Sequence, residues 1–443
     1  MKKLSTRIPS AVLRRLPALV LSMWAAAAAH AQLKIEITSG VRDPIPIAIV
    51  PFGRAVPADG GFDVARVVQQ DLEGSGRFRA MPRTQMQSTP TRADELHLAD
   101  WRAAGNDYVV VGRVEALQDD RLAVEFDLVN VLTGQKLVAG QRFIGSRAAL
   151  RNAAHRVSDV IYEKILGVRG AFATRIAYVS VDGEQGKRRY RLIVADADGE
   201  NPRTVLESRH PIMSPAWSPD GEWLAYVSFE DRASAVWVQR VRTGERTKVS
   251  ARAGINGSPA WSPDGRRLAL TLGGSGGNPD IYVLDLTSQK LERITDDPAI
   301  DTEAVWAPDG NTLYFTSDRA GGPQIYRVAA RSGERPRRVT FGSSYNARPR
   351  ISPDGTQLAM VTLDQGNYRV AVQDLTTNTV RVLSRGRLDE SPSFAPNGAM
   401  LIYSGQEGGR AILATVSVDG LTGQRLTSAE GEVREPVWGP FLP

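Results

Sequence analysis

A repeat with a period of about 44 residues fills the second part of the chain and restricts its possible folds more than any other feature. Most copies carry a Pro-Asp-Gly turn, in which proline fixes φ at the entry and glycine accepts a positive φ. Each full copy adds short strand patterns and shows no helical periodicity. Four strands at this period are typical of a β-propeller blade. The repeat prolines stand 44, 45, 45, 43 and 44 residues apart, at Pro219, Pro263, Pro308, Pro353, Pro396 and Pro440.

The two ends of the repeat region are incomplete in complementary ways. The strand that follows the turn recurs six times, but its first copy at Ile176 has no turn before it. The last copy, Glu-Pro-Val-Trp-Gly-Pro from Glu435, has no strand after it. We therefore predict a six-bladed β-propeller over residues 175–443, in which strands from both ends share one blade and leave no open sheet edge. The recurring strand positions are Ile176, Leu224, Leu268, Leu313, Leu358 and Leu401.

Residues 32–167 follow a different pattern, which predicts a small α/β domain ahead of the propeller. Its last helix carries an apolar stripe and is closed by Gly167, so residues 168–174 form the linker between the two domains. The predicted elements are a strand at 45–50, a helix at 62–72, a strand at 108–115, a hairpin turn at 133–134 and a helix at 147–166. The expected fold class is multidomain, with a small α/β N-terminal domain followed by a six-bladed β-propeller.

Residues 1–31 are predicted to be a signal peptide. They hold five basic and no acidic residues, then an apolar run shorter than the roughly 20 residues of a bilayer span, and Ala29-His30-Ala31 supplies a cleavage site. Cleavage after Ala31 lowers the formal net charge from +6 to +1, because 50 basic and 49 acidic side chains remain. The charge therefore gives no reason to expect nucleic-acid binding, and no later stretch predicts direct membrane insertion.

Residue types that support catalysis or metal binding are sparse. The chain has no cysteine, which excludes disulfides, thiolate nucleophiles and zinc–thiolate sites. Residues 273–277 match the Gly-x-Ser-x-Gly pattern of serine hydrolases, but they lie between two predicted strands and no histidine follows them, so we expect a hairpin loop. The histidines after the signal peptide are scattered, at His97, His155 and His210, and His155 is interpreted as an ordinary helix residue. We assign no catalytic residue, metal ligand or cofactor.

The aspartates of the repeated turns occupy the same position in successive copies, which favours a structural role over a ligand-binding one. An aspartate at this position caps its own turn by accepting a backbone hydrogen bond. The residues concerned are Asp220, Asp264, Asp309 and Asp354.

The segments just before the innermost strands are the stronger functional candidates, because in a propeller they gather on one face around the central channel. They are polar, mixed in charge and irregular, which is more typical of a protein-binding rim than of a catalytic site, where a few acids or bases converge. Plain solvated loops are the alternative. These segments are 210–213, 255–258, 301–303, 345–348, 388–390 and 433–435.

The predicted mature N-terminus is the second unusual element. Leu33, Ile35 and Ile37 alternate with polar residues, as in a strand, but no hairpin partner follows. Two interpretations stay open: an edge strand of the N-terminal domain, or a tether that leaves its dock and adds to the sheet of a partner.

Several stretches occur in a specific order along the chain. They are QLKIEITSGVRDPIPIAIVPFG from Gln32, DLEGSGRF, WRAAGNDYVVVGRVE and the linker GAFATRIAYVS, followed by the repeats that end in EPVWGP. This order resembles the TolB family of the Tol–Pal system of Gram-negative bacteria. The resemblance implies a periplasmic adaptor without catalytic activity or cofactor, monomeric before complex formation, which supports outer-membrane integrity and constriction during cell division.

The resemblance also implies two partners. The peptidoglycan-associated lipoprotein Pal binds the propeller face in that family, and TolA binds the mature N-terminal segment. On this chain, the position of the loops places the lipoprotein contacts at Ile255, Asn256, Ser258, Thr302, Glu303, Asp389 and Glu390. The TolA segment corresponds to Gln32, Leu33, Lys34, Ile35, Glu36, Ile37, Thr38, Ser39, Gly40, Val41, Arg42 and Asp43.

Two other functions, and a calcium site, are alternatives to the adaptor without a metal. A channel-centred propeller hydrolase or lactonase would need paired carboxylates or a clustered metal shell, and the sequence shows no such convergence. A sugar-binding propeller would place aromatic platforms on the rim, where only Tyr345 qualifies. Calcium in the channel has hard oxygen ligands available but no compact acidic loop. Those ligands would be Asp301, Glu303, Asp389 and Glu390.

Overall fold

The computed structural model describes residues 44–54, 62–119, 121–184, 186–274, 277–426 and 431–442. The predicted signal peptide at 1–31 and the segment at 32–43 lie outside the described residues. No helix among the described residues is long and apolar enough to cross a membrane.

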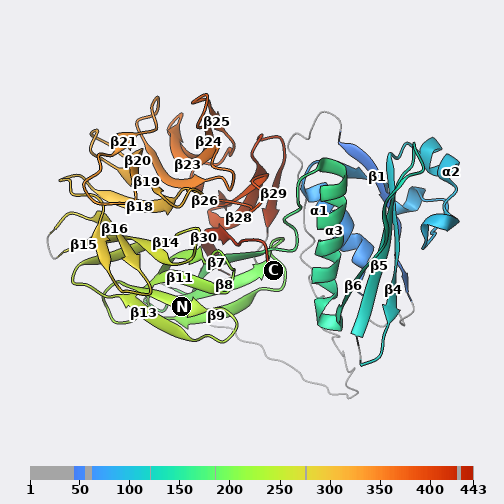
Figure 1. The fold of residues 1–443 in the computed structure, drawn as a ribbon, viewed down its shortest axis with the longest axis horizontal. Helices are drawn as coiled ribbons and strands as arrows, with labels where there is room; N and C mark the ends of the chain where they lie inside the picture. The colour runs from blue at the N-terminus through green and yellow to red at the C-terminus, as the bar shows by residue number, and fades with distance from the viewer. Residues whose placement is uncertain are drawn as a thin grey trace, which may run out of the picture. The chain divides into compact units, whose positions relative to one another are not determined.

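The N-terminal part of the chain forms one mixed sheet with helices packed on it (Figure 1). The strand order is β3-β1-β4-β5-β6, and β2 also pairs with β4. Strand β1 runs parallel to β3 and β4, whereas β4, β5 and β6 form an antiparallel meander. The elements are β1 (Ile45–Ile49), β2 (Gly53–Arg54), α1 (Val64–Gly74), β3 (Phe78–Ala80), 3-10 turns at Arg83–Gln85 and Ala93–Glu95, α2 (Leu98–Ala103), β4 (Tyr108–Ala116), β5 (Arg121–Asn130), β6 (Lys136–Ser146), a 3-10 turn at Arg147–Ala149 and α3 (Leu150–Leu166).

Alternation along the strands divides this core between two faces of the sheet. Ile47, Ile49 and Val110 point to the face covered by α1 and α3, and their neighbours Ala48 and Val109 point to the other face. On that second face the buried Trp101 of α2 completes the packing. The mixed α/β character predicted from the sequence is therefore confirmed.

Two predicted helix starts differ from the structure for local reasons. Helix α1 begins at Val64 rather than at residue 62, because Asp63 is its N-cap and accepts a hydrogen bond from the backbone N–H of Arg66 at 3.0 Å. The segment predicted as a helix from 147 opens with a 3-10 turn, and α3 proper starts at Leu150. Its end agrees with the prediction, since Gly167 adopts the left-handed conformation with φ of 74°.

The second part of the chain forms six four-stranded antiparallel sheets, which are the six predicted blades. The innermost strands contact one another in a closed ring, in the order β10, β14, β18, β22, β26 and β30. The blades are β30-β7-β8-β9, β10-β11-β12-β13, β14-β15-β16-β17, β18-β19-β20-β21, β22-β23-β24-β25 and β26-β27-β28-β29.

The blade strands begin and end as follows. In the first three sheets along the chain they are β7 (Arg175–Asp182), β8 (Arg189–Asp196), β9 (Arg203–Ser208), β10 (Ile212–Trp217), β11 (Trp223–Ser228), β12 (Ala235–Arg240), β13 (Arg246–Ser250), β14 (Ile255–Trp261), β15 (Arg267–Gly273), β16 (Asp280–Asp285) and β17 (Leu291–Arg293). The others are β18 (Asp301–Trp306), β19 (Thr312–Ser317), β20 (Gln324–Ala329), β21 (Arg337–Arg338), β22 (Asn346–Ile351), β23 (Gln357–Asp364), β24 (Asn367–Asp374), β25 (Val380–Val382), β26 (Glu390–Phe394), β27 (Met400–Glu407), β28 (Arg410–Ser417), β29 (Gly423–Leu426) and β30 (Glu432–Trp438).

The ring is closed by strands from the two ends of the propeller sequence, as the incomplete repeats predict. Strand β30 pairs antiparallel with β7, with Trp438 opposite Ile176 and Val433 opposite Ser180. The indole N–H of Trp438 also donates to the Thr174 hydroxyl at 2.8 Å. The first blade is thus built from both ends of the repeat region, with β30 as its innermost strand and β7 paired on both sides.

The turn aspartates cap their own turns, as predicted. In the first repeats the carboxylate of Asp220 accepts the backbone N–H of Glu222 at 2.9 Å, and that of Asp264 accepts the N–H of Arg266 at 3.1 Å. Asn397 replaces the aspartate in one blade and accepts the N–H of Ala399 at 3.1 Å in the same way.

Candidate functional site

Each innermost strand contains a β-bulge at the same position. The register of pairing shifts there in all six blades, and one residue of the bulge has a positive φ between 45° and 57°. A positive φ strains the backbone of any residue other than glycine, and such strain is often found at functional sites. We call these residues the bulge ring: Ser214, Ser258, Glu303, Arg348, Ser391 and Glu435.

The bulge ring lines a cavity of about 530 Å³ along the propeller axis. Its charged members are bonded to one another or to the strands. Glu303 accepts hydrogen bonds from the backbone N–H of Arg348 at 3.2 Å and from the Thr316 hydroxyl at 3.1 Å, and it lies 3.3 Å from Nε of Arg348. Arg348 donates to the Ser391 hydroxyl, and Glu435 accepts the backbone N–H of Ser214.

These contacts affect the ionisation of Arg348. Burial by itself lowers the pKa of its guanidinium, but the negative charges of Glu303, Glu435 and Glu390 outweigh that effect and raise the pKa above its usual value. The bulge ring therefore holds two bonded groups, Glu303 with Arg348 and Ser391, and Glu435 with Ser214, and its arginine stays charged.

Large apolar side chains are exposed at the end of the channel where the innermost strands begin, which we call the channel mouth. Phe341 is 66% exposed in the loop that runs from the outermost strand β21 to β22 on this face, and Ile255 is 46% exposed at the first position of β14. Met213, Ile300 and Tyr368 are exposed at the same end of their blades. Apolar groups exposed on one rim are typical of a protein-binding surface.

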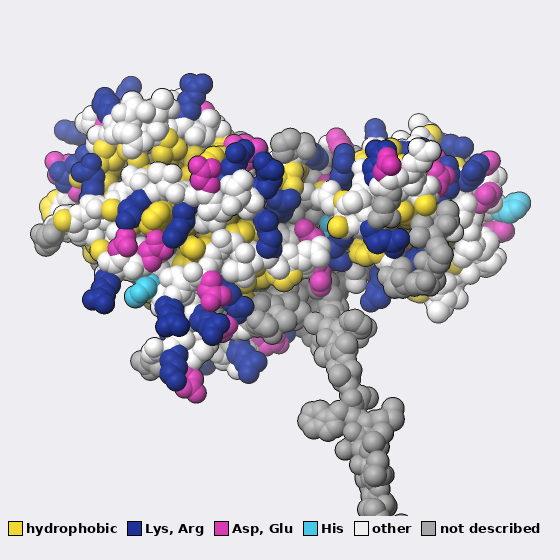
Figure 2. Space-filling view, turned by 90° about the horizontal axis from the view of Figure 1, so that it is seen from below, with side chains coloured by type: hydrophobic (Ala, Val, Ile, Leu, Met, Phe, Trp, Pro, Cys, Tyr) yellow, Lys and Arg dark blue, Asp and Glu magenta, His cyan; other side chains and the backbone are white. Residues whose placement is uncertain are grey.

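The surface charge shows no single-sign field in the view of Figure 2. Basic and acidic side chains are interspersed there, with hydrophobic groups between them. This agrees with the sequence argument against binding to a phosphate backbone.

The residues predicted for the lipoprotein contacts divide into two groups. Ile255 is exposed, and partly exposed side chains belong to Ser258, Thr302, Glu303 and Glu390. Asn256 is only 1% exposed, and its amide accepts from the Ser250 hydroxyl at 2.6 Å and donates to the carbonyl of Arg252 at 2.7 Å.

Asp389 is likewise 2% exposed, and its carboxylate accepts the backbone N–H of Gly386 at 2.8 Å. Burial raises the pKa of this carboxyl. The side chains of Asn256 and Asp389 thus fasten their own loops, and lipoprotein contact at these two positions stays a prediction.

The carboxylates considered for calcium are engaged in separate contacts. Asp301 is fully buried and receives two hydrogen bonds from Arg319, at 2.6 and 2.9 Å. Glu303 accepts hydrogen bonds from Arg348 and Thr316, and Asp389 accepts one from the backbone of its own loop. Among the described residues, the acidic side chains of the rim do not converge on one point, since the only group of three potential metal ligands lies elsewhere.

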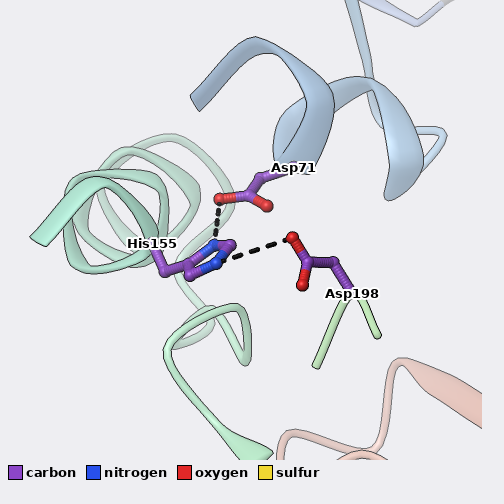
Figure 3. Close-up of side chains that lie close together, drawn as sticks. All are labelled: Asp71, His155 and Asp198. Atoms are coloured by element: carbon purple, nitrogen blue, oxygen red, sulfur yellow. Dashed lines mark hydrogen bonds and ion pairs between the residues drawn. The ribbon is translucent and has the colours of Figure 1, made fainter. Parts of the chain in front are cut away.

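That group consists of Asp71 on α1, His155 on α3 and Asp198 in the turn between β8 and β9 (Figure 3). Nδ1 of His155 lies 2.8 Å from Oδ2 of Asp71, and Nε2 lies 3.6 Å from Oδ2 of Asp198. The hydroxyl of Ser158 donates to the same Asp71 oxygen at 2.6 Å, and Arg151 donates to Asp198.

Protonation of His155 follows from these neighbours. Burial lowers its pKa, but the charge and hydrogen bond of Asp71, and then the charge of Asp198, raise the pKa to about 9. An imidazolium and the guanidinium of Arg151 thus balance the two carboxylates, which favours an ion-pair cluster over a metal site. The sequence interpretation of His155 as an ordinary helix residue missed this cluster, because its partners lie 84 and 43 positions away.

Comparisons with known proteins agree for both parts of the chain. A family model described as the TolB amino-terminal domain matches residues 33–137, and one described as the TolB beta propeller domain matches residues 162–442. The Tol-Pal system protein TolB of Thioalkalivibrio sulfidiphilus is 52% identical over 416 residues, which cover 94% of this chain and 95% of that protein. The protein of the same description from Methylococcus capsulatus is 51% identical over 420 residues, with 95% and 97% covered. A crystal structure of TolB from Acinetobacter baumannii superposes with a TM-score of 0.84 at 41% identity and covers 93% of this chain and all of that one.

Proposed function

This chain belongs to the TolB family of the Tol–Pal system, and on that basis we propose that it works as a non-catalytic adaptor in the periplasm. It binds the lipoprotein Pal through the channel mouth of the propeller and TolA through residues 32–43. In this way it supports outer-membrane integrity and constriction during cell division.

The observation that carries the proposal is the exposed apolar rim of the channel mouth. Phe341 and Ile255 expose large hydrophobic surfaces beside partly exposed polar groups such as Thr302. A protein partner buries such groups, and a surface that combines apolar anchors with a polar rim is typical of a specific interface.

The proposed lipoprotein contacts are therefore Ile255, Ser258, Thr302, Glu303 and Glu390. Asn256 and Asp389 position the loops that present them, because their own side chains are buried and bonded. Truncation of a positioning residue weakens binding by loosening a loop, whereas a bulky residue at Thr302 blocks the surface directly.

The proposed TolA segment at 32–43 rests on the family resemblance and on its alternating pattern. A strand that pairs either with its own domain or with a partner has two states. A lipoprotein that binds the propeller shifts this balance only through a different affinity for the two states. The docked strand and the released tether are thus the two ends of one equilibrium.

Calorimetric titration of the chain lacking residues 1–31 with the soluble domain of its own lipoprotein tests the proposal. Thr302→Arg places a long charged side chain on the rim, and we expect it to abolish binding. The matched control is Thr287→Arg, which adds the same side chain at an exposed position in the turn between β16 and β17, at the other end of the neighbouring blade.

Deletion of residues 32–43 separates the two partners. We expect the deleted chain to keep lipoprotein binding and to lose binding to TolA. Absence of any lipoprotein binding by the intact, folded chain contradicts the adaptor proposal. Equal loss in Thr302→Arg and Thr287→Arg contradicts the placement at the channel mouth.

A further inference from the structure

The channel has a second level, two residues beyond the bulge ring on each innermost strand. Small side chains occupy this level in five blades, and blade β22-β23-β24-β25 has an arginine there. All of these residues except Ser393 line the cavity. The second level consists of Ala216, Ala260, Val305, Arg350, Ser393 and Val437.

The other charged groups of the cavity already have partners. Glu303 is bonded to Arg348 and Thr316, and Glu435 is bonded to the backbone of Ser214. Arg348 is held between Glu303 and Ser391. The two acidic groups of the bulge ring are thus already bonded, either to other ring residues or to the adjacent strand.

Arg350 differs from its neighbours in its contacts. Among the described residues, its one side-chain hydrogen bond runs from Nη1 to the carbonyl of Pro349 at 2.8 Å, and no carboxylate lies within ion-pair distance. A guanidinium has five N–H donors, so most of them are available to the cavity.

The burial of Arg350 and the charges around it also favour an additional anionic partner for its guanidinium. Burial lowers the pKa of its guanidinium, and the nearby charge of Arg348 acts in the same direction. Glu303 and Glu435 act in the opposite direction but do not offset the burial. Burial therefore outweighs the nearby carboxylates at Arg350, whereas the carboxylates outweigh burial at the neighbouring Arg348.

We propose that the second level of the channel is a binding site for a small oxyanion, such as phosphate or a carboxylate, with Arg350 as its principal ligand. The guanidinium fork matches two oxygens of either group, and such bidentate pairs are among the stronger hydrogen bonds in proteins. The cavity volume of about 530 Å³ lies within the usual range for small-molecule sites, roughly 300–1,000 Å³.

Tryptophan side chains that line the channel provide the signal for a binding test. Trp217, Trp261, Trp306 and Trp438 line the cavity, so an anion bound beside them changes the tryptophan fluorescence. The chain lacking residues 1–31 is titrated with inorganic phosphate and, separately, with acetate, at constant ionic strength set by chloride. We expect a saturable change with at least one of the two, and the two titrations distinguish phosphate from carboxylate as the preferred form.

Arg350→Ala is the decisive variant. It reproduces the residue that two other blades carry at Ala216 and Ala260, so the fold is expected to be kept. We expect binding at least about tenfold weaker, because the variant loses the bidentate pair and even one charge-assisted hydrogen bond accounts for about that factor. Arg327→Ala removes the same charge from an exposed position on β20 and is expected to bind like the unaltered protein.

Arg350→Lys provides a second variant if the alanine form does not fold. It keeps the positive charge but lacks the planar guanidinium that contacts two oxygens at once, so binding is expected to weaken without disappearing. No saturable change with either anion overturns the proposal. Equal binding by the Arg350→Ala and Arg327→Ala variants overturns it too, because the anion then binds elsewhere.

Discussion

His155 and Asp71 form a buried hydrogen bond that joins helices α3 and α1, with 2.8 Å between Nδ1 and Oδ2. The imidazole is 1% exposed and also faces Asp198 of the propeller. Because both neighbours are carboxylates, the protonated form of His155 is the stable one in the folded chain. The bond therefore links the stability of the protein to pH.

The first prediction concerns stability between pH 6.5 and about 9. The pKa of His155 is about 9 in the folded state and near 6.5 when unfolded, so the folded state holds one more proton in this window. The contribution of His155 is complete below pH 6.5 and is lost as the pH rises through 9, with a slope of up to about 1.4 kcal/mol per pH unit. Scanning calorimetry across this range measures the fall in melting temperature.

His155→Gln and His97→Gln form a matched pair for this test. The glutamine at 155 donates to Asp71 without carrying a charge, so the variant is expected to be less stable below pH 6.5 and to lose the slope. His97 is exposed, and its variant is expected to retain the slope. An unchanged slope in His155→Gln would show that another group is responsible.

The second prediction concerns the connection between α3 and the propeller. The carboxylate of Asp159 accepts the backbone N–H of Phe172 at 2.7 Å and that of Ala173 at 3.2 Å. Burial raises the pKa of Asp159 to about 6, so above that pH a buried carboxylate holds the segment. Asp159→Ala leaves two partly buried N–H groups without this acceptor, and we expect a loss of about 1–3 kcal/mol in stability.

Limited proteolysis between residues 168 and 174 checks this expectation. Cleavage is expected to be faster in Asp159→Ala than in the unaltered protein. Glu163→Ala, an exposed position one turn further along α3, is the control and is expected to be cleaved at the original rate. Equal rates in all three proteins would mean that Asp159 does not hold the segment.

The third prediction concerns the turn caps. Asp264 accepts the N–H of Arg266 and the hydroxyl of Ser262, and these bonds lower the pKa of its carboxyl, with the Ser262 bond as the largest cause. Asp264→Ala is expected to lower stability by about 0.5–1.5 kcal/mol. Asp264→Asn is expected to cost less, because Asn397 performs the same task in another blade. Thermal melting ranks the two variants, and an equal cost for both would contradict the capping role.

The parts of the fold that were predictable from the sequence depend on local signals. The Pro-Asp-Gly turns set the period, and the incomplete copies at Ile176 and Glu435 indicated how the ring closes. The site was less predictable. At the start of β14 the apolar Ile255 is exposed and the polar Asn256 is buried, the reverse of the usual polarity, because Asn256 is bonded to Ser250 and Arg252, and the sequence did not show these bonds. The partners of His155 come together only through tertiary packing, and no spacing in the sequence indicated them. The exposure of Phe341 had a signal in the sequence, because a large apolar residue stands in the loop before an innermost strand, outside the predicted rim segment at 345–348.

The last prediction concerns ring closure. Strand β30 occupies the innermost position of the first blade, and Val433 is buried in the core between that blade and its neighbour. A chain that ends at Gly431 lacks this strand, leaves the inner edge of β7 unpaired and exposes the apolar groups beneath it. We expect such a chain to aggregate, whereas Val433→Ala keeps the strand and leaves a cavity that costs about 1–3 kcal/mol. Analytical ultracentrifugation with thermal melting distinguishes the two effects. A monomeric truncated chain with an unchanged melting temperature would show that the closure contributes little, since the five remaining blades would then suffice to hold the ring.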